Sequence, residues 1–334
     1  MRMPFNAFHR LDSAALPVFA ANRWTAGLYY WLFSQRFDRE HLAVLRGRYA
    51  YSSNLRDIGT SSPLLRRNVH RLEKGLIMQP RRDVFGEGFI LETVRCYERA
   101  ARRPNYDGEE LKWARDVLNE YFSVVKDTPP IVAARQIYER CVSGMSVCKD
   151  ADVANAYRPY LASEAPHTDV TFKQLEQLFY RRRSVRWYQD APVPLELVQK
   201  AINAASLAPS ACNRQPYRVI VSNEPANAQR IAACAGGTPG WGHQVPAILV
   251  IVGDLSAYPY ERDRHLIYID GSLAAMQLML AAETLGLSTC SINWPDVDSA
   301  ERKLQRILKL APHERVIMLL SVGYSDSSGG IPYS

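Results

Sequence analysis

The chain has 334 residues, 47% hydrophobic and 22% charged, which is the balance of an ordinary globular protein and enough length for two domains. This composition argues against a chain that is disordered throughout. The net charge of +7 favours contact with anions, but the sequence has no zinc-finger spacing, RNA-binding signature or long Lys/Arg tract. We therefore expect no nucleic-acid partner.

The cysteines and the first 33 residues bear on the cellular compartment of the protein. No cysteine belongs to a C-x-x-C pair or to a zinc-like Cys/His spacing, so reduced thiols in a cytoplasmic protein are expected. The start of the chain has no apolar signal-peptide core. The apolar stretch from Trp24 to Phe33 is too short to span a bilayer. It could contact a membrane surface, but a helix buried against the rest of the protein is the favoured interpretation.

Residues 1–165 form a first region of unknown role, and their patterns predict helices. Leu64 to Leu76 carries apolar residues at helical spacing, with Ser61 or Ser62 as the cap and Pro63 at a favourable first position. Further helices are expected at 88–102, 109–125 and 131–148. The polar stretch 162–168 is the expected boundary.

Residues 169–334 form a second region in which helices alternate with short apolar strands. We expect helices at 171–182, 194–206, 270–285 and 299–310, and strands at 217–222, 246–253, 288–294 and 316–322. The strand at 246–253 is apolar throughout, which is typical of a strand buried on both faces. The alternation predicts a central sheet with helices on both faces.

Three segments of this second region carry residue types suited to a ligand. The first runs from Arg181 to Arg186 at the end of a helix. In extended backbone, Arg182, Ser184 and Arg186 would face the same side, where guanidinium groups and a hydroxyl suit phosphate oxygens. Taken alone, such a cluster is more often solvated and merely complements the helix dipole.

The other two segments are connections next to strands. Residues 208–217 read A-P-S-A-C-N-R-Q-P-Y, a loop restricted by prolines and rich in small polar groups that suit a flat polar ring. Residues 285–294 read L-G-L-S-T-C-S-I-N-W and follow a long Ala-rich helix. Each alone is also compatible with an ordinary turn or strand edge.

In this order and at these separations, the three segments resemble the nitroreductase family of flavoproteins over residues 169–331. The matching features are an R-x-S-x-R motif, a P-S-x-x-N-x-Q-P loop, a helix that begins D-G-S-L-A-A-M, and a G-L-x-T-C-like strand. The resemblance implies an α+β fold with a nitroreductase-like mixed central sheet flanked by helices. It also implies an intertwined homodimer with one FMN per active site at the interface.

The resemblance assigns roles residue by residue. The ribityl phosphate region would be held by Arg182, Arg183 and Ser184, and the pyrimidine edge by Arg186. The loop that packs on the flavin, partly from the partner subunit, corresponds to Pro209, Ser210, Ala211, Asn213 and Gln215. The segment near N5 and the other flavin face corresponds to Cys290, Ser291 and Ile292.

These residue types suit hydride chemistry. Hydride reaches the flavin at N5 and leaves negative charge on the pyrimidine edge, where the cation of Arg186 would stabilise it. No protein nucleophile is needed, so Cys212 and Cys290 are expected to be small apolar residues. Trp241 is a candidate for stacking over the site, and His243 is a weaker candidate beside it.

The end of the sequence departs from the family pattern. Family members usually continue into a basic C-terminal arm that helps to hold the FMN phosphate, whereas no basic residue follows Arg315 here. Either the given chain is truncated at Ser334, or Arg182 and Arg183 hold the phosphate alone.

The first region adds a basic helix face. Its segment 68–76 resembles longer nitroreductase-like proteins found near bacterial polysaccharide-synthesis genes. Cations recur at three- and four-residue spacings at Arg66, Arg67, His70, Arg71 and Lys74. They form either a solvated face or an anion site for a nucleotide or a phosphorylated glycan intermediate.

The leading hypothesis is an FMN-dependent oxidoreductase that transfers hydride between NAD(P)H and an unknown organic substrate by a ping-pong mechanism. The absence of a G-x-G-x-x-G fingerprint does not count against NAD(P)H, because this family takes the nicotinamide directly over the flavin. One alternative is an FMN-dependent dehydrogenase of a biosynthetic intermediate, with oxygen as the final acceptor. Another is a non-catalytic flavin-fold protein that binds a partner or a membrane surface.

Overall fold

The computed structural model describes residues 15–34, 37–55, 58–144 and 156–333. Its first part is helical, as expected. The helices of this part are α2 (Arg23–Leu32), α3 (Asp38–Asn54), α4 (Pro63–Leu76), α5 (Glu87–Ala101), α6 (Gly108–Val124) and α7 (Pro129–Ser143). The part of the expected helix 131–148 that follows residue 144 lies outside the described residues, and so does Cys148. The other five cysteines form no disulfide within the described ranges.

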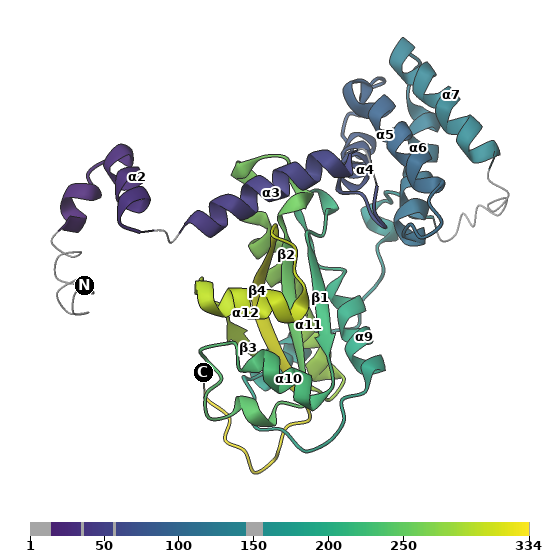
Figure 1. The fold of residues 1–334 in the computed structure, drawn as a ribbon. Helices are drawn as coiled ribbons and strands as arrows, with labels where there is room; N and C mark the ends of the chain where they lie inside the picture. Colours follow the sequence, from purple (N-terminus) through teal and green to yellow (C-terminus); the bar gives the residue numbers. More distant parts are fainter. Residues whose placement is uncertain (1–14, 35–36, 56–57, 145–155, 334) are drawn as a thin grey trace.

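Helices α4 to α7 form a bundle beside the sheet region (Figure 1). Helix α4 begins where its sequence predicts, because the Ser62 hydroxyl accepts a hydrogen bond from the Leu65 N–H (3.2 Å) and Pro63 occupies the first turn. The apolar stripes of these helices meet in a common core, with side chains at most 1% exposed at Leu65, Val69, Leu72, Ile90, Val94, Tyr97, Val117, Leu118 and Tyr121. The bundle therefore has its own hydrophobic core.

The second part of the chain contains a four-stranded sheet in the order β1-β2-β4-β3. The strands are β1 (Tyr217–Ser222), β2 (Ala247–Asp254), β3 (Ser288–Asn293) and β4 (Glu314–Gly323). The three pairings between these strands are antiparallel. Among the described residues, a parallel pairing occurs at an isolated bridge between Ser184 and Thr289. The expected α+β class, with a central sheet flanked by helices, is confirmed, but the four strands form an antiparallel sheet and not the mixed sheet that was expected.

Helices cover both faces of this sheet (Figure 1). One face packs against α10 (Pro225–Ala232) and α12 (Asp298–Leu308), and the other packs against α9 (Leu195–Ala205) and α11 (Leu266–Thr284). Successive side chains of β2 point to opposite faces, so its even positions enter one core and its odd positions enter the other. This arrangement explains why β2 is apolar at almost every position.

Helix α3 packs on the sheet region although it precedes the bundle in sequence. Its residues Ala43 and Val44 join a core with Leu255 and Ile267. At Gly47, an added Cβ would lie 2.7 Å from the Leu255 side chain, so this close approach requires glycine. The sequence patterns did not predict α3, and the division of the chain near residue 165 stays a prediction.

Helix α2 corrects the interpretation of the stretch Trp24 to Phe33. The stretch is helical, but none of the residues of α2 is buried, and the helix lies apart from the rest of the chain (Figure 1). Its aromatic rings contact local neighbours instead, such as Phe19 with Tyr29 at 5.5 Å between centroids. The favoured expectation of a helix buried against the protein is therefore wrong.

The stretch Glu261–Thr284, which contains α11, is long and apolar enough to cross a membrane by length and composition alone. The core helix of a globular protein passes the same test, and α11 packs against the sheet through Ala274, Ala275 and Leu278. Burial thus explains part of its apolar character.

Candidate functional site

The segment Arg182–Arg186 leaves helix α8 (Phe172–Arg181) and lies along the edge of β3. The Val185 N–H donates a hydrogen bond to the Thr289 carbonyl (3.1 Å), and the side-chain amide of Gln244 donates to the Arg186 carbonyl. These hydrogen bonds hold the segment in an extended form, in which Arg182, Ser184 and Arg186 face the same side.

The arginines at the end of α8 differ in their partners. Arg181 forms an ion pair with Glu283 (Nε to Oε1, 3.0 Å), and Arg183 donates from Nη1 to the carbonyls of Phe179 (3.0 Å) and Arg182 (2.9 Å). The half-buried Arg182 guanidinium has no hydrogen bond or ion pair with any residue of the described ranges. Of these three cations, Arg182 is therefore the one that an incoming anion would meet with its donors free.

Cys290 lies beside this segment. Burial raises the pKa of its thiol, although the charge of Arg186, a hydrogen bond with Ser184 and the charge of Arg182 act in the opposite direction. With 2% of the residue exposed, the thiol is neutral and inaccessible, as expected for a small apolar residue. Ser291 is exposed, whereas Ile292 is 3% exposed and packs in the core, so its side chain is not free to contact a ligand.

The loop Pro209–Gln215 is tightly constrained. Cys212, Asn213 and Gln215 adopt positive φ angles of 55°, 50° and 47°, a conformation that is costly for residues with a Cβ. The loop is held by its own side chains, since Ser210 Oγ accepts from the Gln215 N–H (3.0 Å) and Gln215 Nε2 donates to the Ser206 carbonyl (2.7 Å). Clusters of such strain are typical of functional sites.

Three hydrogen bonds that the sequence did not predict hold this loop in place. The Asp270 carboxylate accepts a hydrogen bond from the Ala211 N–H (2.9 Å), and Arg66 donates from Nε to the Asn213 carbonyl (2.7 Å). The buried Arg214 donates to the Ala257 carbonyl (2.8 Å). Asp270 could have been noticed, because it is the single charged residue between Ile267 and Ala282.

Asp270 is an unusual acid. Burial raises its pKa, while the hydrogen bonds from the Ala211 N–H and the Tyr258 hydroxyl act in the opposite direction. Its Oδ2 atom accepts from Tyr258 at 3.3 Å as well as from the loop. The carboxylate thus joins the start of α11 to the strained loop.

The two expected flavin segments lie at opposite ends of the sheet within one chain. Helix α11 runs between the two segments. Its Asp270 contacts the loop, and its Glu283, thirteen residues later, pairs with Arg181. At 1.5 Å per residue, these contacts are about 20 Å apart along the helix. One chain therefore brings Arg182–Arg186 together with Cys290, but it does not bring either of them to Pro209–Gln215.

The donor set at Arg182–Arg186 fits a phosphate-bearing flavin. The free guanidinium of Arg182 is one such feature. Another is the Thr289 hydroxyl beside Ser184, which is buried and lacks a hydrogen-bond partner within the described residues. These groups supply donors of the kind that a phosphate or ribityl chain accepts.

The two aromatic candidates lie near Arg186, because the side-chain amide of Gln244, the residue after His243, donates both to the Arg186 carbonyl and to the Trp241 carbonyl (3.0 Å). Trp241 is 7% exposed, donates from its indole N–H to the Gly237 carbonyl (3.0 Å) and packs in the core, so it is not free to stack over a ligand. His243 is exposed.

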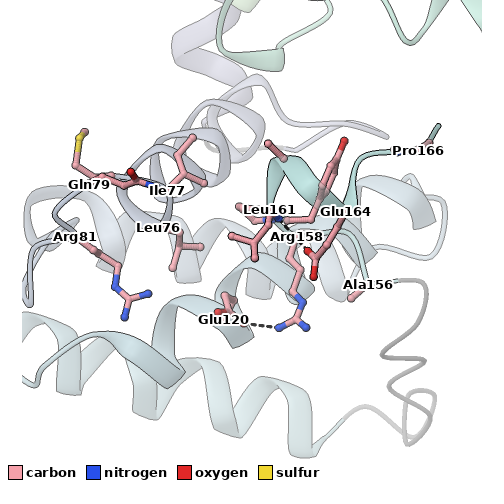
Figure 2. A pocket seen from close by; sticks show the side chains of 14 residues that line it. Leu76, Ile77, Gln79, Arg81, Glu120, Ala156, Arg158, Leu161, Glu164 and Pro166 are labelled. Atoms are coloured by element: carbon pink, nitrogen blue, oxygen red, sulfur yellow. Dashed lines mark hydrogen bonds and ion pairs between the residues drawn. The ribbon is translucent and has the colours of Figure 1, made fainter. Parts of the chain in front are cut away.

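Two of the pockets in the described structure lie in the helical bundle, away from Arg182. One of about 910 Å³ is lined by the end of α4, by α6 and by residues 156–166, and one of its arginines, Arg158, is paired with Glu120 at 2.6 Å (Figure 2). Another of about 360 Å³ lies between α4 and α5. Neither coincides with the expected flavin contacts.

Comparisons with known proteins find similarity in the second part of the chain. Residues 180–239 and 225–324 match the model of the nitroreductase family, and this part of the chain has a nitroreductase-like fold. The match includes the segment Arg182–Arg186, the loop Pro209–Gln215 and strand β3.

Individual relatives cover the same part. An NADH dehydrogenase of Thermus thermophilus is 27% identical over 180 residues, which cover 45% of this chain and 85% of the relative. An FMN reductase [NAD(P)H] of Bacillus subtilis is 29% identical over 166 residues, covering 45% and 66%. The solved structure of an FMN-dependent nitroreductase of Clostridium difficile is 27% identical, with a TM-score of 0.41 and coverage of 46% and 90%.

Proposed function

Because residues 180–324 match the nitroreductase family and adopt its fold, we propose that the chain is an FMN-dependent oxidoreductase that transfers hydride between NAD(P)H and an organic substrate. The observation that carries this proposal is the free Arg182 guanidinium, held beside Ser184 and Cys290 on the edge of β3. The relatives named FMN reductase and NADH dehydrogenase support the choice of cofactor and reductant.

The residues of this site would bind and orient the cofactor. When bound, FMN would accept and donate the hydride. Arg182, with Ser184 nearby, would hold the phosphate and ribityl chain through charged hydrogen bonds. Arg186 would place a cation at the pyrimidine edge, where it favours negative charge. No residue of the chain needs to act as a nucleophile, which agrees with the buried neutral thiol of Cys290.

We also propose that the active unit is a homodimer. The separation of about 20 Å along α11 between the contacts of Asp270 and Glu283 supports this proposal, because it places Arg182 far from the loop Pro209–Gln215 of the same chain. Two copies related by a twofold axis would form two flavin sites. Each copy would supply its arginine segment to one site and its loop to the other.

An exposed apolar surface on α8 and α11 supports the same assembly. Exposed apolar side chains lie on both helices, at Phe172 (76%), Leu175 (38%), Phe179 (45%), Ile269 (54%), Leu273 (45%) and Met276 (39%). The three on α11 follow the spacing i, i+4, i+7 and form one stripe. Apolar stripes of this kind are typical of obligate interfaces, and a second copy of the chain is the proposed occupant.

With one flavin face available, NAD(P)H and the organic substrate would bind in turn in a ping-pong cycle. The proposed compartment is the cytoplasm, in keeping with the free cysteines. The resemblance of segment 68–76 supports a role in bacterial polysaccharide or other biosynthesis.

The visible spectrum of the purified protein tests the proposal. We expect a flavin absorption band, either as purified or after addition of FMN, and bleaching of that band by NADH or NADPH without oxygen. A protein that neither contains nor takes up flavin would refute the enzyme proposal and favour a non-catalytic binding role. Flavin that is bleached by an organic donor but by neither nicotinamide would indicate a dehydrogenase instead.

A further inference from the structure

The pocket between α4 and α5 has an unusual lining. Its volume is about 360 Å³, and its walls include the cations Arg71, Lys74 and Arg82 together with the rings of Phe85 and Phe89. No acidic residue lines it. The other pocket of the bundle differs, because its lining includes Glu120, which pairs with Arg158.

None of the three cations of this pocket forms an ion pair within the part of the chain that the structure describes. Of the nearby acids, Glu73 contacts His70 (3.2 Å) and Asp83 pairs with Lys126 (2.5 Å). Glu92, whose charge acts on Arg71, accepts a hydrogen bond from Asn68 (3.0 Å). The pocket therefore concentrates positive charge in a concave surface, which attracts anions.

Arg71 is also held in one orientation. Its guanidinium carbon lies 3.7 Å from the centroid of the Phe89 ring, a cation–π contact that fixes the plane of the fork. A guanidinium fixed in this way loses less entropy when its N–H groups donate to a tetrahedral oxyanion. Gly86 and Phe89 line the same pocket, which therefore lies at the N-terminal end of α5, where the helix dipole is positive and the first turn also carries Glu87.

This pocket is connected to the strained loop by helix α4. Partial burial and the charge of Arg67 lower the pKa of Arg71, while the charges of Cys212 and Glu92 act in the opposite direction, and α4 packs against the turn Ala211–Asn213 of the loop. On the same helix, Arg66 donates to the Asn213 carbonyl (2.7 Å). From Arg67 to Lys74, cations at i, i+4 and i+7 run for about 10 Å along one side of α4.

We propose that Arg71, Lys74 and Arg82 form a binding site for the phosphate group of a small molecule whose remaining part extends toward the loop Pro209–Gln215. The proposal rests on the oxidoreductase function, since that loop is the expected flavin contact. The site would give the enzyme a preference for phosphorylated reactants. The phosphate can belong to the organic substrate or to the 2′ position of NADPH, and the test separates these sources.

Direct binding tests the pocket without reliance on turnover. Inorganic pyrophosphate is titrated calorimetrically into the full-length protein at low ionic strength, with Arg71→Gln, Arg82→Gln and the double variant compared. Each substitution should weaken binding about tenfold, and added salt should weaken binding to the unaltered protein. Arg140→Gln, which removes an exposed cation on α7 of the same bundle, should have no effect.

Turnover identifies the source of the phosphate. The neutral acceptor 4-nitrobenzyl alcohol is compared with 4-nitrobenzyl phosphate, and NADH is compared with NADPH, in the unaltered protein and in the double variant. If the phosphate belongs to the organic substrate, kcat/KM for 4-nitrobenzyl phosphate should fall about a hundredfold in the double variant. The kcat/KM for 4-nitrobenzyl alcohol should then be unchanged. If only the kcat/KM for NADPH falls, the phosphate belongs to the reductant.

The outcomes for the two proposals are separate. Flavin content and turnover of the neutral acceptor with NADH, in which neither reactant carries the proposed phosphate, report on the oxidoreductase function, and neither should change in the double variant. If the unaltered protein binds no pyrophosphate, or if the double variant binds it equally well, the phosphate site is refuted whether or not the protein contains flavin. Thermal unfolding of each variant establishes that the fold is intact.

Discussion

The Arg66 guanidinium of helix α4 donates a hydrogen bond of 2.7 Å to the carbonyl of Asn213, 147 positions later in the chain. The same guanidinium forms an ion pair of 3.1 Å with Glu110, whose side chain is fully buried. This contact connects the helical bundle to the strained loop of the sheet region. The bundle is therefore a structural support for the candidate flavin site.

Loss of this contact should affect both stability and flavin binding. Arg66→Ala leaves the Glu110 carboxylate without its cation, although Ser61 and Tyr106 still donate to it, and we expect a loss of about 2–3 kcal/mol. The Asn213 carbonyl also loses its donor, so FMN affinity should fall about tenfold. Urea unfolding and flavin titration measure the two effects.

The variant Arg66→Ala/Glu110→Gln separates the two roles of Arg66. Removing the buried charge should restore part of the stability and leave FMN affinity low. Recovery of FMN affinity together with stability would mean that the contact with Asn213 has no specific role in the site.

Arg182→Ala should weaken FMN binding strongly. The Arg182 guanidinium has no partner among the described residues, so its donors are available to the phosphate, and a charge-assisted pair of this kind accounts for about a tenfold to hundredfold change in affinity. The matched control is Arg181→Ala, because Arg181 pairs with Glu283. Unchanged flavin occupancy in Arg182→Ala would count against the phosphate role.

Two defective chains should complement each other. A chain with Arg182→Ala and a chain with Asn213→Ala each lose flavin as homodimers. In a mixed dimer, one site receives both defects and the other receives none, so about half of the sites should bind FMN normally. Co-refolding followed by flavin quantification of the isolated mixed dimer provides the measurement, and a mixed dimer without flavin would mean that both segments act within one chain.

The apolar stripe on α11 should be required for assembly. Leu273, 45% exposed in the single chain, would be buried by a second copy, so Leu273→Glu places a charge in the interface. We expect a monomer by light scattering, with loss of bound FMN. Val297→Glu, at a comparably exposed apolar residue that precedes α12, is the control and should remain dimeric.

The pair Arg218–Glu314 should make stability depend on pH. Burial raises the Glu314 pKa, but hydrogen bonds from Arg218 (2.6 Å) and the Ala311 N–H (2.8 Å) outweigh burial and leave the pKa lowered. A lowered folded-state pKa stabilises the protein above the unfolded value of about 4.3, and this contribution disappears as pH falls through the folded value.

Glu314→Gln should therefore cost up to about 1 kcal/mol at pH 7, a modest amount because Arg218 is half exposed, and little near pH 3. Urea unfolding at both pH values measures the difference. Glu139→Gln, at an exposed position on α7, is expected to change stability at neither pH. An equal loss for Glu314→Gln at both pH values would contradict the assignment.

Local patterns in the sequence determined most of the secondary structure. Ser62 and Pro63 predicted the start of α4, and the continuous apolar run of β2 predicted a strand buried on two faces, because capping and side-chain alternation act over a few residues. The ordered motifs from Arg182 to Ile292 also indicated the family that the comparisons support. Helix α3 was not predicted, because its buried residues are those that pack against Leu255 and Ile267, which lie far away in sequence.

Tertiary structure decided how far apart the parts of the candidate site lie within one chain. The resemblance assigned Pro209–Gln215 partly to the partner subunit, and the length of α11 separates this loop from Arg182–Arg186. The sequence also left the basic face of α4 as either a solvated surface or an anion site. In the folded chain the cations of that face have different neighbours. Arg66 donates to the Asn213 carbonyl, whereas Arg71 lines a pocket. Such contacts depend on distances between elements, which no local pattern encodes.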